Sequence, residues 1–146
     1  MEINEEMFWK MFQDHWGYTD EELKMFKSDP HRARAGQKMF SPELEKKFLI
    51  IEVVDSHGCA VGMKPGDRLY FRGMAVLDAG KSTVPWCVQA FSYLPAISSM
   101  CHDRWMEGLD PNGMIYNRFS CPDCGVRSGG WGRATMKAYV KDESEL

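Results

Sequence analysis

The start of the chain shows apolar side chains at helical spacing. Between residues 3 and 16, Met and aromatic side chains recur every three or four positions, with most charged residues between them. Gly17 is a typical helix stop. Thr19, followed three positions later by Glu22, forms a capping-box motif, which predicts a second, short helix that ends before Pro30. The pattern predicts a helical N-terminal arm.

After a polar stretch, the pattern changes to that of β-structure. Residues 48–54 are β-branched and apolar on both faces, which is typical of a central strand. Lys64-Pro65-Gly66-Asp67 predicts a type II turn. The other predicted strands are short or alternating segments at residues 68–71, 74–77, 114–120 and 134–140.

One long helix is predicted between these strands, over residues 86–107. Trp86 and Cys87 would begin it, Gly108 would close it, and Pro95 would kink it. The polar residues 31–45 are interpreted as a linker.

The order of these elements predicts an α+β fold. We expect a helical N-terminal arm over residues 1–40, followed by a cysteine-bearing domain over residues 41–146 in which an antiparallel sheet is packed by one long helix. A length of 146 residues suits one domain that can build its own core without a metal or disulfides.

Charge and hydropathy exclude several classes of function. The net charge is −3, and no basic stripe indicates a nucleic-acid partner. No apolar run approaches the ~20 residues of a membrane span. The acidic N-terminus lacks the apolar core of a secretion signal, so we expect a cytoplasmic protein.

Five cysteines in a reducing compartment point to metal or redox chemistry rather than to disulfides. Cys121-Pro122-Asp123-Cys124-Gly125 is the sharpest motif. A tight turn of this kind directs backbone N–H groups at the sulfurs and suits zinc or iron. No second pair of this kind exists, so further ligands must come singly, from the set Cys59, Cys87, Cys101, His57 and His102.

Helix geometry narrows that set. Cys87 and Cys101 are fourteen residues apart, about 21 Å along a continuous helix, so one metal cannot bind both. Cys101 lies on the apolar stripe and is expected to be a buried thiol. The simplest set of metal ligands is therefore Cys59, Cys87 and Cys121, with Cys124 or a small molecule as the fourth ligand. Four thiolates would close a structural site, whereas three would leave an open position for catalysis.

Other interpretations of these residues stay open. The thiols could be independent and reduced, Cys121 and Cys124 could exchange disulfides, or Cys87 could be a nucleophile whose pKa is lowered by a helix N-terminus. His57 and Asp123 are the nearest candidates for acid–base catalysis. A metal-free binding or oligomerisation module is the main alternative, with an interface formed by the aromatic residues Phe8, Trp9, Phe12 and Trp16.

Three motifs resemble a family of small bacterial and archaeal proteins that is common in anaerobes. They are Cys59-Ala60-Val61-Gly62-Met63-Lys64-Pro65-Gly66-Asp67, Pro85-Trp86-Cys87 and Cys121-Pro122-Asp123. Longer members are also similar at residues 17–22, 108–115 and 129–132. The resemblance implies a pattern of three cysteines, at Cys59, Cys87 and Cys121, with Cys124 outside it. It implies no particular activity.

Together these features predict a metal–thiolate protein that carries an iron–sulfur cluster or zinc, with an open or variable fourth ligand. It would act as a lyase or hydratase-type catalyst, or as a subunit of a larger enzyme. A homo-oligomer or a larger assembly would form through residues 1–40.

Overall fold

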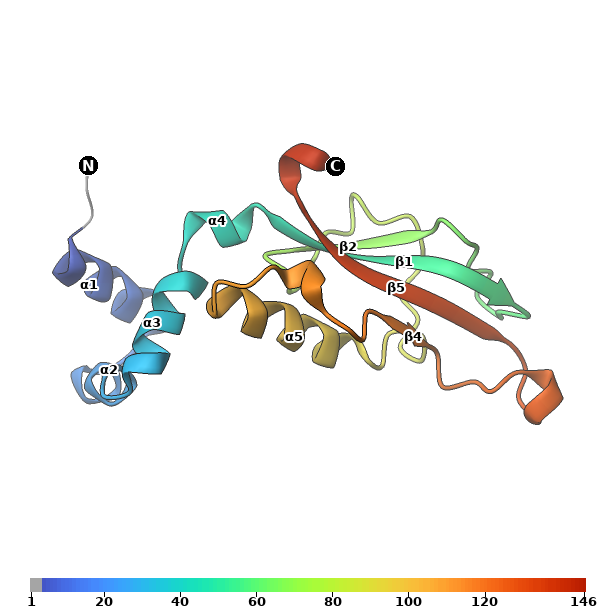
Figure 1. Cartoon of the computed structure of the whole chain (residues 1–146), viewed down its shortest axis with the longest axis horizontal. Helices are drawn as coiled ribbons and strands as arrows, with labels where there is room; N and C mark the ends of the chain where they lie inside the picture. The colour runs from blue at the N-terminus through green and yellow to red at the C-terminus, as the bar shows by residue number, and fades with distance from the viewer. Residues whose placement is uncertain (1–3) are drawn as a thin grey trace. The chain divides into compact units, whose positions relative to one another are not determined.

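The computed structural model describes residues 4–146, and the chain divides into two compact units (Figure 1). The N-terminal unit ends at Ser41, and the second unit runs from Pro42 to Leu146. Within the described residues, no helix has the length and apolar character needed to cross a bilayer.

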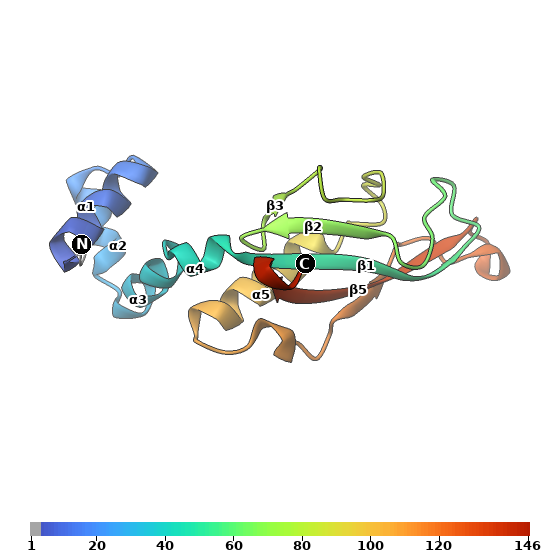
Figure 2. The same cartoon turned by 90° about the horizontal axis from the view of Figure 1, so that it is seen from above.

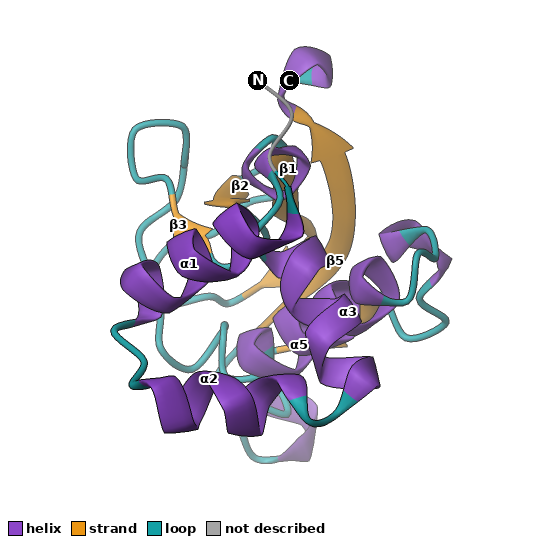
Figure 3. Cartoon of the chain, turned by 90° about the vertical axis from the view of Figure 1, so that its left-hand side faces the viewer, coloured by secondary structure: helices purple, strands orange, loops and turns teal. Residues whose placement is uncertain are grey.

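Three helices form the N-terminal unit (Figure 3): α1 (Glu5–Trp16), α2 (Asp20–Lys27) and α3 (Pro30–Met39). Gly17 ends α1 in the left-handed conformation, with a φ of 69°. The capping box at the start of α2 is confirmed, because Thr19 and Glu22 bond reciprocally to each other's backbone N–H. The predicted start of the first helix at residue 3 lies outside the described residues.

The interpretation of residues 31–45 as a linker was wrong, because α3 and the single turn α4 (Pro42–Glu45) occupy most of this segment. Asp29 caps α3 by accepting the backbone N–H groups of His31 and Arg32, and Pro30 stands in the first turn, where its missing N–H costs nothing. These signals outweigh the polar composition of the helix.

Aromatic rings fill the centre of the N-terminal unit. Phe12 is 2% exposed and lies 5.0 Å from Phe26 between ring centroids. Its ring also contacts those of Phe8, Trp9, Trp16, Tyr18 and Phe40. Gly36 of α3 packs against this cluster, since a Cβ there would lie 2.9 Å from a Phe26 ring carbon.

The second unit confirms the predicted α+β class. Its five strands form one antiparallel sheet in the order β3-β2-β1-β5-β4, and α5 (Leu94–Met106) runs along one face of it (Figures 1 and 2). The strands are β1 (Lys47–His57), β2 (Arg68–Arg72), β3 (Val76–Leu77), β4 (Arg118–Ser120) and β5 (Arg133–Asp142). The remaining elements are three 3₁₀ turns at Pro111–Gly113, Val126–Ser128 and Glu143–Glu145.

The core of this unit follows the sequence pattern closely. β5 alternates as predicted, with Ala134, Met136, Ala138 and Val140 buried on one face. β1 is buried on both faces over residues 48–51, as expected for a central strand. The type II turn before β2 is also present, because the Asp67 N–H donates to the Lys64 carbonyl and Gly66 has a φ of 94°.

The long helix begins later than predicted, at Leu94 instead of Trp86. Pro95 therefore lies in the first turn of α5 and does not kink it. A proline in the helix interior would lose a hydrogen bond and clash with the preceding turn, so the helix does not extend back past it. Consequently Cys87 lies in the loop before α5 and not at a helix N-terminus, and the 21 Å separation from Cys101 does not apply.

Candidate functional site

Four of the five cysteines line one open pocket of about 490 Å³ in the second unit. It lies at the end of the sheet where β1 finishes and β5 begins (Figure 1). Cys59 comes from the loop after β1, Cys87 from the loop before α5, and Cys121 and Cys124 from the segment after β4. Three separate stretches of chain thus bring thiols to one place.

The loops that carry Cys59 and Cys121 are held close together by two glycines. A Cβ built on Gly132 would overlap the carbonyl group of Gly58, and one built on Gly58 would lie 3.0 Å from the Trp131 carbonyl oxygen. Gly58 also has a φ of 67°, which disfavours any other residue. The absence of side chains at this crossing is what allows the loops to meet.

Cys121 continues β4 beyond its last residue. Its N–H donates to the Ala134 carbonyl at 3.0 Å, and its Sγ accepts the Ala134 N–H at 3.4 Å. The expected N–H bond to a sulfur is therefore present, but it comes from β5. The N–H of Gly125 in the turn itself donates to Asp123 instead.

Asp123 holds the loop that follows it. Its carboxylate accepts the backbone N–H groups of Gly125, Trp131 and Gly132 at 2.9–3.3 Å. The hydrogen bond from Gly125, followed by those from Gly132 and Trp131, lowers the pKa of Asp123 below its usual range. We assign Asp123 a positioning role, since both oxygens are engaged by backbone donors.

Replacing Asp123 by Ala is expected to release the loop at residues 124–132. Proteolysis there and alkylation of Cys124 should both accelerate several-fold, because three N–H groups lose their acceptor. Asp103→Ala, on an exposed position of α5, is the matched control. Unchanged rates in Asp123→Ala would contradict the role.

The same loop should loosen in acid in the unmodified protein. Because the folded pKa is depressed, the contribution of Asp123 is complete above the ordinary Asp pKa of about 3.9 and is lost as pH falls through the lower folded pKa. Alkylation is too slow at such pH, so digestion by pepsin is the suitable measurement.

All five thiols are free, and their surroundings differ. Cys59, Cys87 and Cys121 are half-buried, and Cys124 is exposed, with its Sγ donating to the Ser128 carbonyl at 3.3 Å. Cys101 is fully buried, as predicted, and burial raises its pKa to about 11. Cys101 is thus a packing residue.

Neither candidate histidine enters the pocket. His57 is exposed at the end of β1, opposite Arg133 in the ladder, and is not among the lining residues. The His102 ring lies within hydrogen-bond distance of the carbonyl oxygens of Ser98 and Gly73, at 2.8 and 3.0 Å. Of the two candidate acid–base residues, His57 and Asp123, only Asp123 therefore lies at the pocket.

The side chains around the pocket are not arranged as the ligands of a single ion. Among residues 4–146, no three His, Cys, Asp or Glu side chains are grouped closely enough to hold one metal ion. Tetrahedral zinc binds thiolates at about 2.3 Å, which requires sulfurs about 3.8 Å apart. The arrangement does not fit a mononuclear zinc site.

Three other residues of the pocket wall carry chemistry that the sequence analysis missed. Gln89, Trp131 and Arg133 line it beside the thiols, and Trp131 is 88% exposed. The sequence pattern placed Gln89 inside a helix that in fact begins only at Leu94, so it did not predict that Gln89 lines the pocket. The Gly-rich stretch around Trp131 was the available signal for a binding loop.

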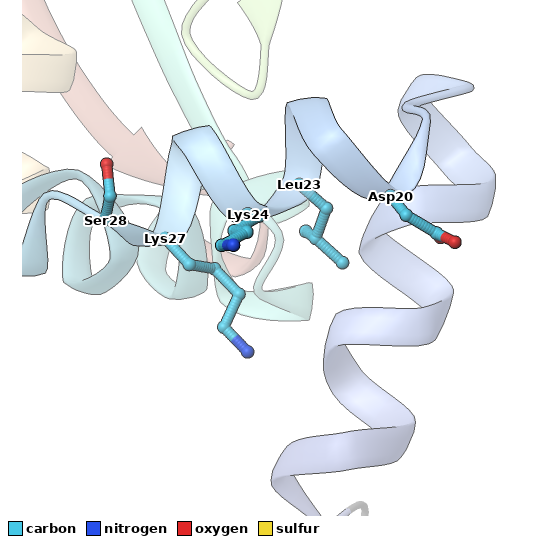
Figure 4. A pocket seen from close by; sticks show the side chains of 5 residues that line it. All are labelled: Asp20, Leu23, Lys24, Lys27 and Ser28. Carbon is cyan, nitrogen blue, oxygen red and sulfur yellow. The ribbon is translucent and has the colours of Figure 1, made fainter.

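A second hollow, of about 500 Å³, lies on α2 in the N-terminal unit (Figure 4). One helix and its cap supply all of its lining residues, and the Ser28 hydroxyl points to the opposite side from the Lys27 ammonium group. Lys27 instead lies over the Trp9 ring, 4.9 Å from its centroid. This surface brings no reactive groups together.

Comparisons with protein-family models, curated proteins and solved structures found no significant match to this chain.

Proposed function

We propose that this is a cytoplasmic iron–sulfur protein whose cluster is held by Cys59, Cys87 and Cys121. The observation that supports this most directly is the convergence of three half-buried free thiols, from three separate segments, on one open pocket. Free thiols in such numbers are typical of a reducing compartment.

A cluster places weaker demands on the positions of the three thiols than a single ion does. In a cluster each thiolate binds a different iron atom, so the protein sulfurs can stand further apart than the ligands of one zinc ion. The pocket, at about 490 Å³, leaves room for a group of atoms between the thiols.

The surroundings of Cys121 also favour a ligand role. The N–H of Ala134 donates to its sulfur, and hydrogen bonds of this kind to ligand sulfurs tune the cluster and orient the ligand. The neighbouring Asp123 fixes the turn, so Cys121 is presented on a rigid support.

Three protein ligands would leave one position of a cluster open to water or substrate, and an open metal position supplies Lewis-acid chemistry of the hydratase or lyase type. Gln89 and Arg133 would then be available to orient a polar substrate. A role as a subunit of a larger enzyme, assembled through residues 1–40, fits the same site. Cys124, exposed and bonded to Ser128, is the candidate for a variable fourth ligand.

The test is iron and sulfide analysis, with the visible spectrum, of the full chain purified without oxygen. We expect bound iron and sulfide in the unmodified chain, and a loss of at least about 80% of the iron in Cys59→Ala, Cys87→Ala and Cys121→Ala, as each removes a ligand. Cys124→Ala should keep most of it. Cys101→Ala is the matched control, since this buried thiol contacts the Met114 sulfur and is not among the residues that line the pocket.

Two results would overturn the proposal that these cysteines hold an iron–sulfur cluster. Stoichiometric zinc without iron would show that the thiols close around one ion on binding. A metal-free chain that forms a stable oligomer by light scattering would favour the alternative, a binding module that uses the aromatic arm. Of the aromatic residues expected to form that interface, Trp9 and Phe12 are buried in the N-terminal unit, Phe8 is half-buried and Trp16 is exposed. The alternative therefore rests on Trp16 and on the exposed side chains of Met7 and Met11 on the same helix.

A further inference from the structure

The edge strand β4 leaves one side of its backbone unpaired. The Ala138 N–H donates to the Asn117 carbonyl at 2.7 Å, and the Cys121 N–H donates to the Ala134 carbonyl at 3.0 Å. Since hydrogen-bonding directions alternate along a strand, the N–H and C=O groups of Arg118 and Ser120 point away from β5. Within the described part of the chain, no backbone group bonds to them.

Beside this free edge lies a groove of about 350 Å³ between β4 and α5. Figure 1 shows β4 next to the N-terminal end of α5. The walls of the groove are mostly apolar and aromatic, formed by Tyr93, Ala96, Ile97, Met100, Tyr116, Arg118, Phe119 and Ser120. An unpaired strand edge beside an apolar groove can accept an extended peptide as an added strand.

The two faces of β4 differ in chemistry. Phe119 pairs with the buried Met136 and contacts the Tyr93 ring, so it faces the helix side. Arg118, one position earlier, also lines the groove, but the alternation of a strand places its side chain on the opposite face, where its ladder partner is Lys137. No acidic side chain in residues 4–146 forms an ion pair with Arg118.

We propose that β4 binds an extended peptide as an added strand, with apolar and acidic residues alternating along the peptide. Its backbone would bond to the free groups of Arg118 and Ser120. Its apolar side chains would enter the groove beside α5, and a carboxylate would lie next to Arg118 on the other face. This surface is separate from the thiol pocket and does not depend on the proposed cluster.

Charge makes a second copy of this chain a poorer occupant than such a peptide. Residues 115–120 carry no acidic side chain, so a second β4 would bring no carboxylate to Arg118. In the symmetric register centred on Arg118, two guanidinium groups would lie directly opposite each other, which destabilises the pairing.

The test uses the full chain, labelled with ¹⁵N, and a six-residue blocked peptide of alternating valine and glutamate. We expect chemical-shift changes confined to residues 115–121 and α5. Arg118→Glu should weaken binding at least about tenfold and should create binding to the matching valine–lysine peptide, because the charge match is exchanged.

A second pair of variants isolates the backbone contribution. Ser120→Pro removes an N–H that points away from β5, so it should abolish peptide binding while the sheet spectrum is kept. Ser120→Ala keeps the N–H and should bind like the unmodified chain. The proposal would be overturned if both variants bound the peptide equally, or if the chemical-shift changes lay elsewhere in the protein or were absent. Self-association through β4 that the peptide does not disrupt would overturn it as well.

Discussion

Gly132→Ala is expected to disrupt the thiol pocket and to destabilise the second unit by about 3 kcal/mol or more, the upper end of overpacking effects. The new methyl group would overlap the Gly58 carbonyl and lie 2.7 Å from the His57 carbonyl oxygen. Both obstacles are main-chain atoms at the end of the β1–β5 ladder, so no side-chain rotation relieves the clash. The loops must separate, and Cys59 moves away from Cys121.

Thermal unfolding followed by circular dichroism and anaerobic iron content are the two measurements. We expect the unfolding midpoint to fall by roughly 10 °C and, if the proposed cluster is bound, most of its iron to be lost. Gly80→Ala is the matched control, because a Cβ there meets only the Asp78 carboxylate, at 3.4 Å, and Gly80 has no positive φ. A variant that unfolds like the control would show that the two loops are not in contact in solution.

Local signals with a clear mechanism predicted the fold well. The Thr19–Glu22 capping box, the Pro65-Gly66 turn and the alternation along β5 each depend on neighbouring residues only, so the sequence contains all the information they need. The α+β class followed from the order of these elements.

The errors came from segments where two signals competed. Composition suggested a linker at residues 31–45, although the Asp29–Pro30 start signal was present and was decisive for α3. Apolar spacing extended the long helix back to Trp86, although Pro95 limited it to Leu94. In both cases a proline reported the boundary more reliably than the average character of the segment.

The candidate site depended on long-range contacts that a single sequence does not display. Cys59, Cys87, Cys121 and Cys124 were candidates from their residue type, and they all line one pocket. That a metal binds there stays a prediction. The crossing of Gly58 and Gly132 arises only when residues far apart in the chain meet. The use of Asp123 as an acceptor for three N–H groups depends on how the loop that follows it folds back, which residue type alone does not reveal.

Phe12→Ala is expected to unfold the N-terminal unit while the sheet stays folded. Removing a buried phenylalanine typically costs about 3–5 kcal/mol. The unit ends at Ser41, and a core of that size supplies little more than about 3–5 kcal/mol in total. Because the Phe12 ring contacts six other aromatic rings, its loss removes the centre of that core.

Hydrogen exchange of the full chain, read by mass spectrometry, measures the two units in one sample. Amides of α1, α2 and α3 should lose their protection in Phe12→Ala, whereas those of β1 and β5 should keep theirs. Met25→Ala is the control, because this side chain is 68% exposed and should cost less than about 0.5 kcal/mol. Equal loss of protection in β1 and β5 would mean that the two units unfold as one cooperative body, and the N-terminal helices would then be part of the scaffold that supports the thiol pocket.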